Sequence, residues 1–292
     1  MRRAIYILPA MLAGCATLNT TLPSAPPEQF QAESDIQHAA AYDKYMDSHE
    51  RLIRISRPIL AANAPLCDKT REDIGAVTMR LKGLPKALRP LAKARLGFVG
   101  KEPRVLLAGG SGLKIGAIIK GPNGKPISAY SEALDIPPYK TQTVCDYPVR
   151  LKYSAAVNAY ADGRHITVTT GLMEFASDEH IALIVGHELA HNTQGHIRKI
   201  IQNTILALGR GTFARQFESE ADYVGLYYSA RAGYAIDGAE QLWRKMGLRS
   251  VKSMSVAKSH PGTPLRFVQL KAASAEIVAK RAAGEPLEPN YR

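Results

Sequence analysis

The feature that most constrains this chain is the pentapeptide His187-Glu-Leu-Ala-His191, within a segment from Ser177 to Ile197 that has a helical pattern. Ser177 is a suitable N-cap, and the two acidic residues after it favour the start of a helix. Residues four positions apart lie about 40° apart around a helix, so both imidazoles can reach one ion, and zinc accepts such nitrogens. Glu188 is rotated by about 100° from His187, which suits a general base beside a metal-bound water better than a ligand.

A third ligand is expected on a following helix. Metzincins place a glycine three residues and a histidine six residues after the second histidine, and Gln194 and Ile197 occupy those positions here. The stretch Glu218-Ser-Glu-Ala-Asp222 instead offers two carboxylates at i and i+4 on one helix face. Glu218 is the candidate ligand, and Asp222 can accept a hydrogen bond from a ligand histidine and fix its tautomer. Small Ala221 lets two helices approach, whereas the alternative, an exposed acidic face, leaves the upstream histidines unexplained.

Four stretches follow one another in a fixed order along the second half of the chain. They are Val157-Asn-Ala-Tyr-Ala161 with Thr169-Thr-Gly-Leu172, Gly186-His-Glu-Leu-Ala-His191, Phe217-Glu-Ser-Glu-Ala-Asp222, and Ser259-His-Pro261 with Arg266 six residues after the histidine. Together they resemble the family-48 zinc metallopeptidases, the gluzincins that include HtpX-like and CAAX-prenyl proteases, and among them the bacterial periplasmic lipoprotein branch. The likeness covers about residues 146–270 and implies a mainly helical α+β zincin-type domain with a small edge β-sheet.

The same resemblance implies one zinc ion per chain, held by His187, His191 and Glu218, and protein or peptide substrates. It also implies that the strand from Asn158 to Thr170 is a sheet edge, where Asn158 and Ala159 hold an extended substrate by main-chain pairing. The additional transmembrane helices of the integral-membrane branches are lacking, so the lipidated or membrane-embedded substrates of those branches are not expected.

Two residues near the C-terminus have several interpretations. His260 is a fourth ligand in a resting state, a stabiliser of the reaction intermediate, or only the end of a loop before the last helix. Arg266 orients His260 or Asp222, or pairs at the surface. His165 and His196 are interpreted as packing or surface histidines.

The N-terminal residues 1–15 have the pattern of a bacterial lipoprotein signal. Two arginines precede an apolar run that is too short to span a membrane. Leu12-Ala-Gly-Cys15 resembles the lipobox, which implies cleavage after residue 14 and lipidation of Cys15; the alternative is an uncleaved or conventionally cleaved leader. With Ala16 after the cysteine, the resemblance favours the outer membrane, facing the periplasm.

Two further cysteines, Cys67 and Cys145, would then lie in an oxidising compartment. In such a compartment two remaining thiols most simply pair as a disulfide, and the alternative is two buried free thiols.

The net charge also depends on the compartment. The formal charge is +12 over 292 residues, which would ordinarily suggest a nucleic-acid partner. Without Arg2 and Arg3 it falls to +10, and in the periplasm this surplus meets anionic lipids and envelope polymers, so nucleic acid is not expected. With 46% hydrophobic and 22% charged residues the chain is neither disordered nor disulfide-dense, and its core is substantial.

Five segments are predicted along the chain. They are a signal peptide at 1–14, a lipidated tether at 15–27, a helical region at 28–82, a β-rich insert at 83–145, and the peptidase domain at 146–292. The helical region shows one expected buried stripe, at Phe30, Ile36, Ala40, Tyr45, Leu52, Ile53 and Ile59. In the insert, strands are expected at 104–108 and 113–119, with a turn at 121–124. The stretch 112–127 resembles part of a PDZ domain, although plain β-hairpins are the simpler interpretation.

These patterns predict a zinc-dependent endopeptidase of the bacterial envelope, anchored by its lipid. It would hydrolyse misfolded or misassembled envelope proteins through a zinc-activated water, with Glu188 as the general base. The alternative is an envelope chaperone or assembly factor whose zinc site is largely self-inhibited, which the β-rich insert and ligation by His260 would favour. No oligomeric state is predicted.

Overall fold

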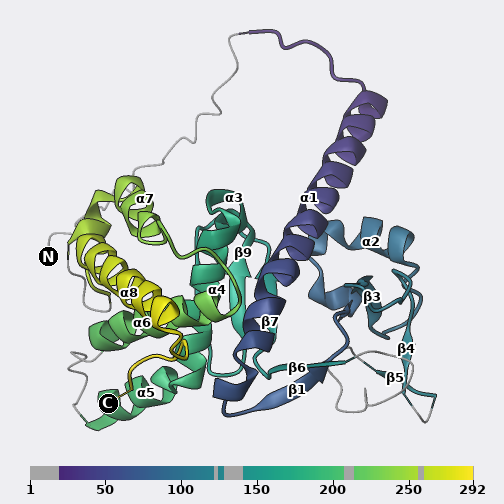
Figure 1. The fold of residues 1–292 in the computed structure, drawn as a ribbon. Helices are drawn as coiled ribbons and strands as arrows, with labels where there is room; N and C mark the ends of the chain where they lie inside the picture. The colour runs from purple at the N-terminus through teal and green to yellow at the C-terminus, as the bar shows by residue number, and fades with distance from the viewer. Residues whose placement is uncertain (1–19, 122–123, 128–140, 207–213, 256–259, 292) are drawn as a thin grey trace, which may run out of the picture. The chain divides into compact units, whose positions relative to one another are not determined.

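The computed structural model describes residues 20–121, 124–127, 141–206, 214–255 and 260–291 (Figure 1). The chain divides into two compact units, residues 1–37 and residues 38–292. The first unit contributes the start of helix α1 (Pro27–Ala62), and the second holds the other described elements. The predicted signal peptide, Cys15 and the start of the tether lie outside the described residues.

Helix α1 buries the later part of its predicted stripe but not the first part. Tyr45, Leu52 and Ile59 are buried, whereas Phe30 and Ile36 are 70% and 62% exposed. Ala40 is also exposed, and Ile53 is half-buried. The stripe prediction is therefore wrong for the first turns, because the apolar core of the described residues begins only at Tyr42. The first turns depend instead on polar pairs four residues apart, with Gln31 donating to Asp35 and Gln37 to Glu33.

The second half of α1 packs within the same compact unit as the helices of the C-terminal half. Arg51 donates to the Ala176 carbonyl at 2.7 Å and to Asp178 Oδ1 at 2.6 Å. Tyr234 in turn donates to the carbonyl of Ile55 in α1 at 3.0 Å. Burial alone would raise the pKa of Asp178, but Arg51 and Arg54 outweigh it and lower that pKa.

Three two-stranded antiparallel ribbons form the region between α1 and the peptidase segment. The strand pairs are β1 (Thr70–Asp73) with β6 (Gln142–Cys145), β2 (Val77–Met79) with β3 (Arg104–Leu107), and β4 (Ile119–Lys120) with β5 (Pro126–Ile127). Short helices lie between them, at η1 (Ala64–Leu66), η2 (Leu81–Gly83), η3 (Lys86–Leu88) and α2 (Arg89–Leu96). Since β1 and β2 belong to the segment 28–82, the division expected at residue 82 runs through two ribbons.

The expected strand at 113–119 is wrong for most of its length. Only Ile119 lies in β4, because Gly112 and Gly116 adopt left-handed conformations, with φ of +76° and +81°, that interrupt an extended chain. The stretch that resembles part of a PDZ domain contains β4 and β5, which pair antiparallel, and the Gly121 amide donates to the Lys125 carbonyl at 2.9 Å.

A disulfide joins Cys67 to Cys145, with their Cα atoms 5.7 Å apart. Cys145 ends β6 and lies opposite Thr70 of β1. The covalent bond therefore reinforces the same end of the ribbon that main-chain hydrogen bonds already hold.

A three-stranded sheet precedes the C-terminal helices. Its order is β7 (Val149–Lys152), β9 (Ile166–Thr169) and β8 (Ala159–Ala161), with β7 parallel and β8 antiparallel to β9. The single strand expected from 158 to 170 is thus wrong. Gly163, at φ +83°, lies in the turn of a β8–β9 hairpin. Of these two strands β8 is at the edge of the sheet and β9 is in the centre.

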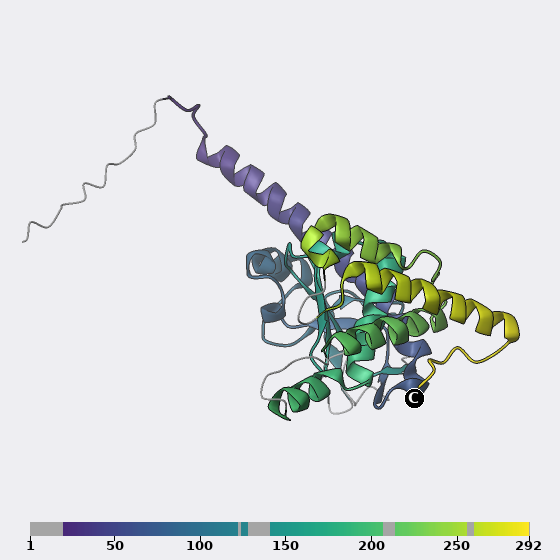
Figure 2. The ribbon, with the colours of Figure 1, turned by 90° about the vertical axis from the view of Figure 1, so that its left-hand side faces the viewer.

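The C-terminal half is helical. Its elements are α3 (Thr170–Phe175), α4 (Asp178–Thr193), α5 (His196–Leu206), α6 (Ala214–Arg231), α7 (Gln241–Arg249), η5 (Val251–Met254) and α8 (Thr263–Ala283). Ser177 caps α4 as expected, its hydroxyl accepting from the His180 amide. Both ribbon views show α8 running beside α6 (Figures 1 and 2). The prediction of a mainly helical α+β fold with small sheets is confirmed, and among the described residues no helix has the length and apolar character of a membrane span.

Candidate metal centre

The site is built where helices α4 and α6 cross at very short range. A β-carbon added to Gly186 would lie 2.3 Å from the Gly225 carbonyl oxygen, and one added to Gly225 would lie 2.5 Å from the His187 amide nitrogen. Only glycine at both positions permits this contact between two backbones. The approach brings the acidic face of α6 against the histidines of α4, and buried Ala221 supports it.

Three predicted ligands converge in this crossing. His187 Nε2 and His191 Nε2 are 3.0 Å apart, and each lies 3.5 Å from a carboxylate oxygen of Glu218. In a tetrahedral zinc site with bonds of about 2.0–2.1 Å, neighbouring ligand atoms are separated by about 3.4 Å. Two imidazole nitrogens and the Glu218 carboxylate, which turns one oxygen toward each of them, therefore fit a single zinc ion.

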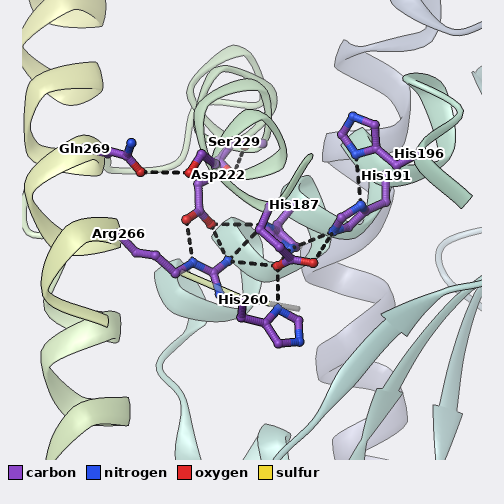
Figure 3. Close-up of polar contacts among 11 residues, drawn as sticks. His187, His191, His196, Asp222, Ser229, His260, Arg266 and Gln269 are labelled. Carbon is purple, nitrogen blue, oxygen red and sulfur yellow. Dashed lines mark hydrogen bonds and ion pairs between the residues drawn. The ribbon is translucent and has the colours of Figure 1, made fainter. Parts of the chain in front are cut away.

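Asp222 and Arg266 orient His187 from the Nδ1 side of its ring. His187 Nδ1 lies 3.0 Å from Asp222 Oδ1. Because Nε2 faces the ligand cluster, Nδ1 carries a hydrogen and donates a hydrogen bond to the carboxylate. Arg266 donates to both oxygens of Asp222, at 2.6 and 2.7 Å (Figure 3). It also stacks on Trp243, with Cζ 3.4 Å from the ring centroid. Of the interpretations open for Arg266, the structure places it on Asp222 and in the interior, with 6% exposure.

The protonation of His187 makes metal binding depend on pH. Burial alone would lower the pKa of His187, but hydrogen bonds to Asp222 and Glu218 outweigh it and raise the pKa to about 10. A metal ion binds only the neutral imidazole, so below this pKa binding must displace a proton, and affinity increases as pH rises.

We expect about one proton to be released per zinc bound near pH 7, and the affinity to rise about tenfold per pH unit between about pH 7 and 9. Calorimetric titrations in buffers of different ionisation enthalpy measure this number directly. Asp222→Asn removes a carboxylate that raises the pKa of His187, so the variant should release fewer protons than the wild type. Equal enthalpies in all buffers would contradict the assignment.

Glu188 lies on α4 between the two histidines in sequence and is 7% exposed. Burial raises the pKa of its carboxyl, and the nearby His187 and His191 act in the opposite direction. A buried carboxylate is a stronger proton acceptor than an exposed one, which is the property a general base requires.

His196 is a member of the site that the sequence interpretation missed. Its ring is fully buried, with Nδ1 2.9 Å from His191 Nδ1 (Figure 3). Its Nε2 lies 3.0 Å from Glu220 Oε2. Because His191 turns Nε2 toward the ligand cluster, its Nδ1–H donates to His196, and His196 then donates from Nε2 to Glu220. The stacked ring of Phe217, 4.8 Å away between centroids, holds His196 in this orientation.

The predicted unbroken helix from 177 to 197 concealed this contact. Five positions along one helix correspond to a rotation of about 140°, which would carry His196 away from His191. Gly195, at φ +63°, instead lies between the end of α4 and the start of α5, so the helix is interrupted before His196 and the chain changes direction. A glycine directly before a histidine at a helix end was the available signal. His165 is as interpreted, bonded to Asp162 in the β8–β9 turn.

Replacing His196 with phenylalanine is expected to weaken zinc binding by about 10- to 100-fold. The new ring keeps the volume and the stacking on Phe217 but offers His191 no acceptor. Competition with a chromophoric chelator measures the effect. Glu220→Gln, which leaves the His191–His196 contact in place, should lose less affinity, and an unchanged affinity in His196→Phe would exclude the orienting role.

His260 approaches the cluster from the exposed side. Its Nδ1 lies 3.0 Å from Glu218 Oε2, and 56% of its side chain is accessible. Burial alone would raise the pKa of Glu218, but hydrogen bonds from His187, His191 and His260 lower it overall. His260 therefore contacts the carboxylate of the candidate ligand Glu218, while Ser259 lies outside the described residues.

A cleft of about 580 Å³ opens over the histidines. Ala159 of the edge strand β8 and Asn158, the residue before it, line the cleft, so these two predicted residues lie at the same site. Trp243 and Met246 of α7 are also in its lining. The cleft is thus bordered by the main chain of the edge strand β8 and by apolar side chains of α7, with the ligand cluster between them.

Comparison with known proteins agrees with this geometry. The family model described as peptidase family M48 matches residues 138–210 and 200–274. The Arabidopsis thaliana protein named mitochondrial metalloendopeptidase OMA1 is 35% identical over 115 residues, which cover 31% of this chain and 24% of that protein. The chain therefore spans about a quarter of the curated relative it matches. No solved structure matches the chain.

Proposed function

We propose that the chain is a zinc-dependent endopeptidase of peptidase family M48, whose model matches residues 138–274. The observation that carries the proposal is the convergence of His187, His191 and the Glu218 carboxylate within one crossing of two helices, with Glu188 on the same helix as the histidines. A zinc ion held there would supply a Lewis acid that brings the pKa of water to about 7 and polarises a peptide carbonyl.

The side chains of the site then perform the proton transfers. Glu188 accepts a proton from the attacking water as the C–O bond forms, and passes it to the amine nitrogen as the peptide C–N bond breaks. Its burial, which raises its pKa, makes the carboxylate basic enough to take that proton. Asp222 and His196 keep both ligand imidazoles in the tautomer that turns Nε2 toward the ligand cluster.

Substrate binding is proposed at β8. Its free edge lines the cleft through Asn158 and Ala159, and pairing of main chain with main chain accepts any sequence that is extended. Folded proteins rarely offer such a segment, so misfolded or misassembled proteins are the proposed substrates.

The bacterial envelope is the proposed location. The lipobox-like Leu12-Ala-Gly-Cys15 supports a lipid anchor at Cys15 on the outer membrane, facing the periplasm. The Cys67–Cys145 disulfide supports an oxidising compartment, since such bonds are rare where thiols are kept reduced.

Metal dependence tests the proposal. The purified full chain should digest unfolded casein, lose the activity when a chelator removes the metal, and recover it with one equivalent of zinc but not with magnesium. Casein cleavage that persists after chelation, or that a serine-protease inhibitor abolishes, would contradict a zinc peptidase.

A second candidate function is an envelope chaperone or assembly factor with a self-inhibited zinc site. The contact between His260 and Glu218 favours it, because a side chain on a ligand carboxylate competes with substrate for space near the metal. Function of a catalytically inactive variant in cells distinguishes the two candidates.

A further inference from the structure

Nearly all of the net charge of the chain is concentrated in one segment. Residues 80–125 contain eleven lysines and arginines but a single acidic residue, Glu102, whereas the formal charge of the whole chain is +12. The metal centre, which lies in other elements, does not account for this distribution. The segment includes α2, β3, β4 and the loops between them.

Some of these cations stabilise the fold and others are available to a partner. Arg89 and Arg104 donate to backbone carbonyls, and Arg95 pairs with Asp43. Lys93, Lys101 and Lys114 are exposed, and within the part of the chain that the structure describes they form no salt bridge. These exposed lysines leave positive charge that an anionic partner can compensate.

Two loops of this segment lie side by side and each presents an aliphatic side chain. Arg104 donates to the Gly116 carbonyl at 2.6 Å, and a side chain on Gly116 would come within 3.1 Å of the Leu96 carbonyl, so both residues that flank the loop 97–103 contact Gly116 of the loop 112–117. Val99 in the first loop is 91% exposed and Ile115 in the second is 62% exposed. Each lies within two residues of an exposed lysine, Lys101 or Lys114.

We propose that Lys93, Val99, Lys101, Lys114 and Ile115 form a membrane-docking surface for anionic phospholipids. Lysines at a bilayer surface attract phosphate headgroups at about 1 kcal/mol each, and neighbouring aliphatic side chains enter the boundary between headgroups and acyl chains. This surface acts in addition to any lipid on Cys15 and does not depend on the peptidase activity.

Nucleic acid fits the same surface poorly. Single-stranded binding sites place aromatic rings among their basic residues so that bases can stack. Phe98 is the one aromatic residue in 80–125, and it is 3% exposed. Exposed aliphatic side chains among lysines instead match the composition of a lipid interface.

Vesicle binding tests the docking surface. The full chain carrying Cys15→Ser, which removes the predicted anchor, is mixed with vesicles of phosphatidylcholine alone or of phosphatidylcholine with phosphatidylglycerol. We expect flotation with the anionic vesicles only, and less of it as salt increases. Lys101→Glu with Lys114→Glu should weaken the binding by about tenfold or more, and Val99→Ser with Ile115→Ser should also weaken it.

Matched variants control for charge and apolar content elsewhere. Arg198→Glu with Lys271→Glu makes the same change in net charge, and Val268→Ser with Val278→Ser removes two exposed valines from α8. Both pairs should bind as the unaltered surface does. Equal binding to neutral and anionic vesicles would overturn the proposal, and so would an equal loss of binding in the control pairs. Tighter binding to a soluble acidic polymer that substitution of Val99 and Ile115 leaves unchanged would also overturn it.

Discussion

Replacing Glu188 with glutamine is expected to lower kcat for peptide hydrolysis by about 10²- to 10⁴-fold, because the amide keeps the shape of the carboxylate but cannot accept a proton. Zinc should remain bound, since Glu188 is not one of the three converging ligands. Steady-state cleavage of a quenched fluorescent peptide, with zinc content measured on the same sample, separates the two effects. Hydrolysis at the wild-type rate by a zinc-loaded variant would refute the role of Glu188.

Two companion measurements sharpen the result. Glu179→Gln changes a carboxylate in the first turn of the same helix, far along it from the histidines, and should leave kcat unaltered. In cells, Glu188→Gln should fail to correct the envelope phenotypes of a deletion strain if proteolysis is the main activity. Full correction by this variant would instead favour the chaperone function.

Gly225→Ala is expected to destabilise the fold by about 3 kcal/mol or more and to weaken zinc binding at the same time. The added methyl would lie 2.5 Å from the His187 amide nitrogen and 2.7 Å from the Gly186 carbonyl carbon. Both atoms are backbone of a buried helix, so only a displacement of α6 from α4 relieves the clash. That displacement carries Glu218 away from the histidines. Chemical denaturation and a zinc titration measure the two consequences.

Gly247→Ala is the matched control for that substitution. Gly247 also lies in a helix, but its added methyl would meet the ends of the Thr263 and Met254 side chains, which can move. Alanine favours a helix over glycine by about 1 kcal/mol, so the control should have nearly unchanged stability. If Gly225→Ala is equally harmless, the close crossing is not what assembles the site.

Local spacing explains why so much of the site could be predicted. The two histidines lie four residues apart on one helix, and Glu218 and Asp222 lie four residues apart on another, so the arrangement within each pair follows from helix geometry alone. The fold class was accessible for a similar reason, since amphipathic periodicity and the Ser177 cap are properties of short stretches.

The remainder depends on tertiary contacts that no short stretch contains. The closeness of α4 and α6 rests on Gly186 and Gly225, which are far apart in sequence and have no side chain to signal the contact. The relay through His196 needs the helix break at Gly195, and the exposure of Phe30 reflects the lack of an apolar layer against it in the described residues. Periodicity reports which face of a helix is apolar, but not whether anything covers it.

The disulfide between Cys67 and Cys145 affects what happens when the backbone of the chain is cut. It closes a covalent ring across a sequence separation of 78 residues, and this ring contains the whole basic segment. A single backbone cut anywhere inside the ring therefore leaves the two fragments joined through the disulfide. A cut in this region therefore leaves α1 covalently connected to the helices of the candidate metal centre as long as the disulfide is intact.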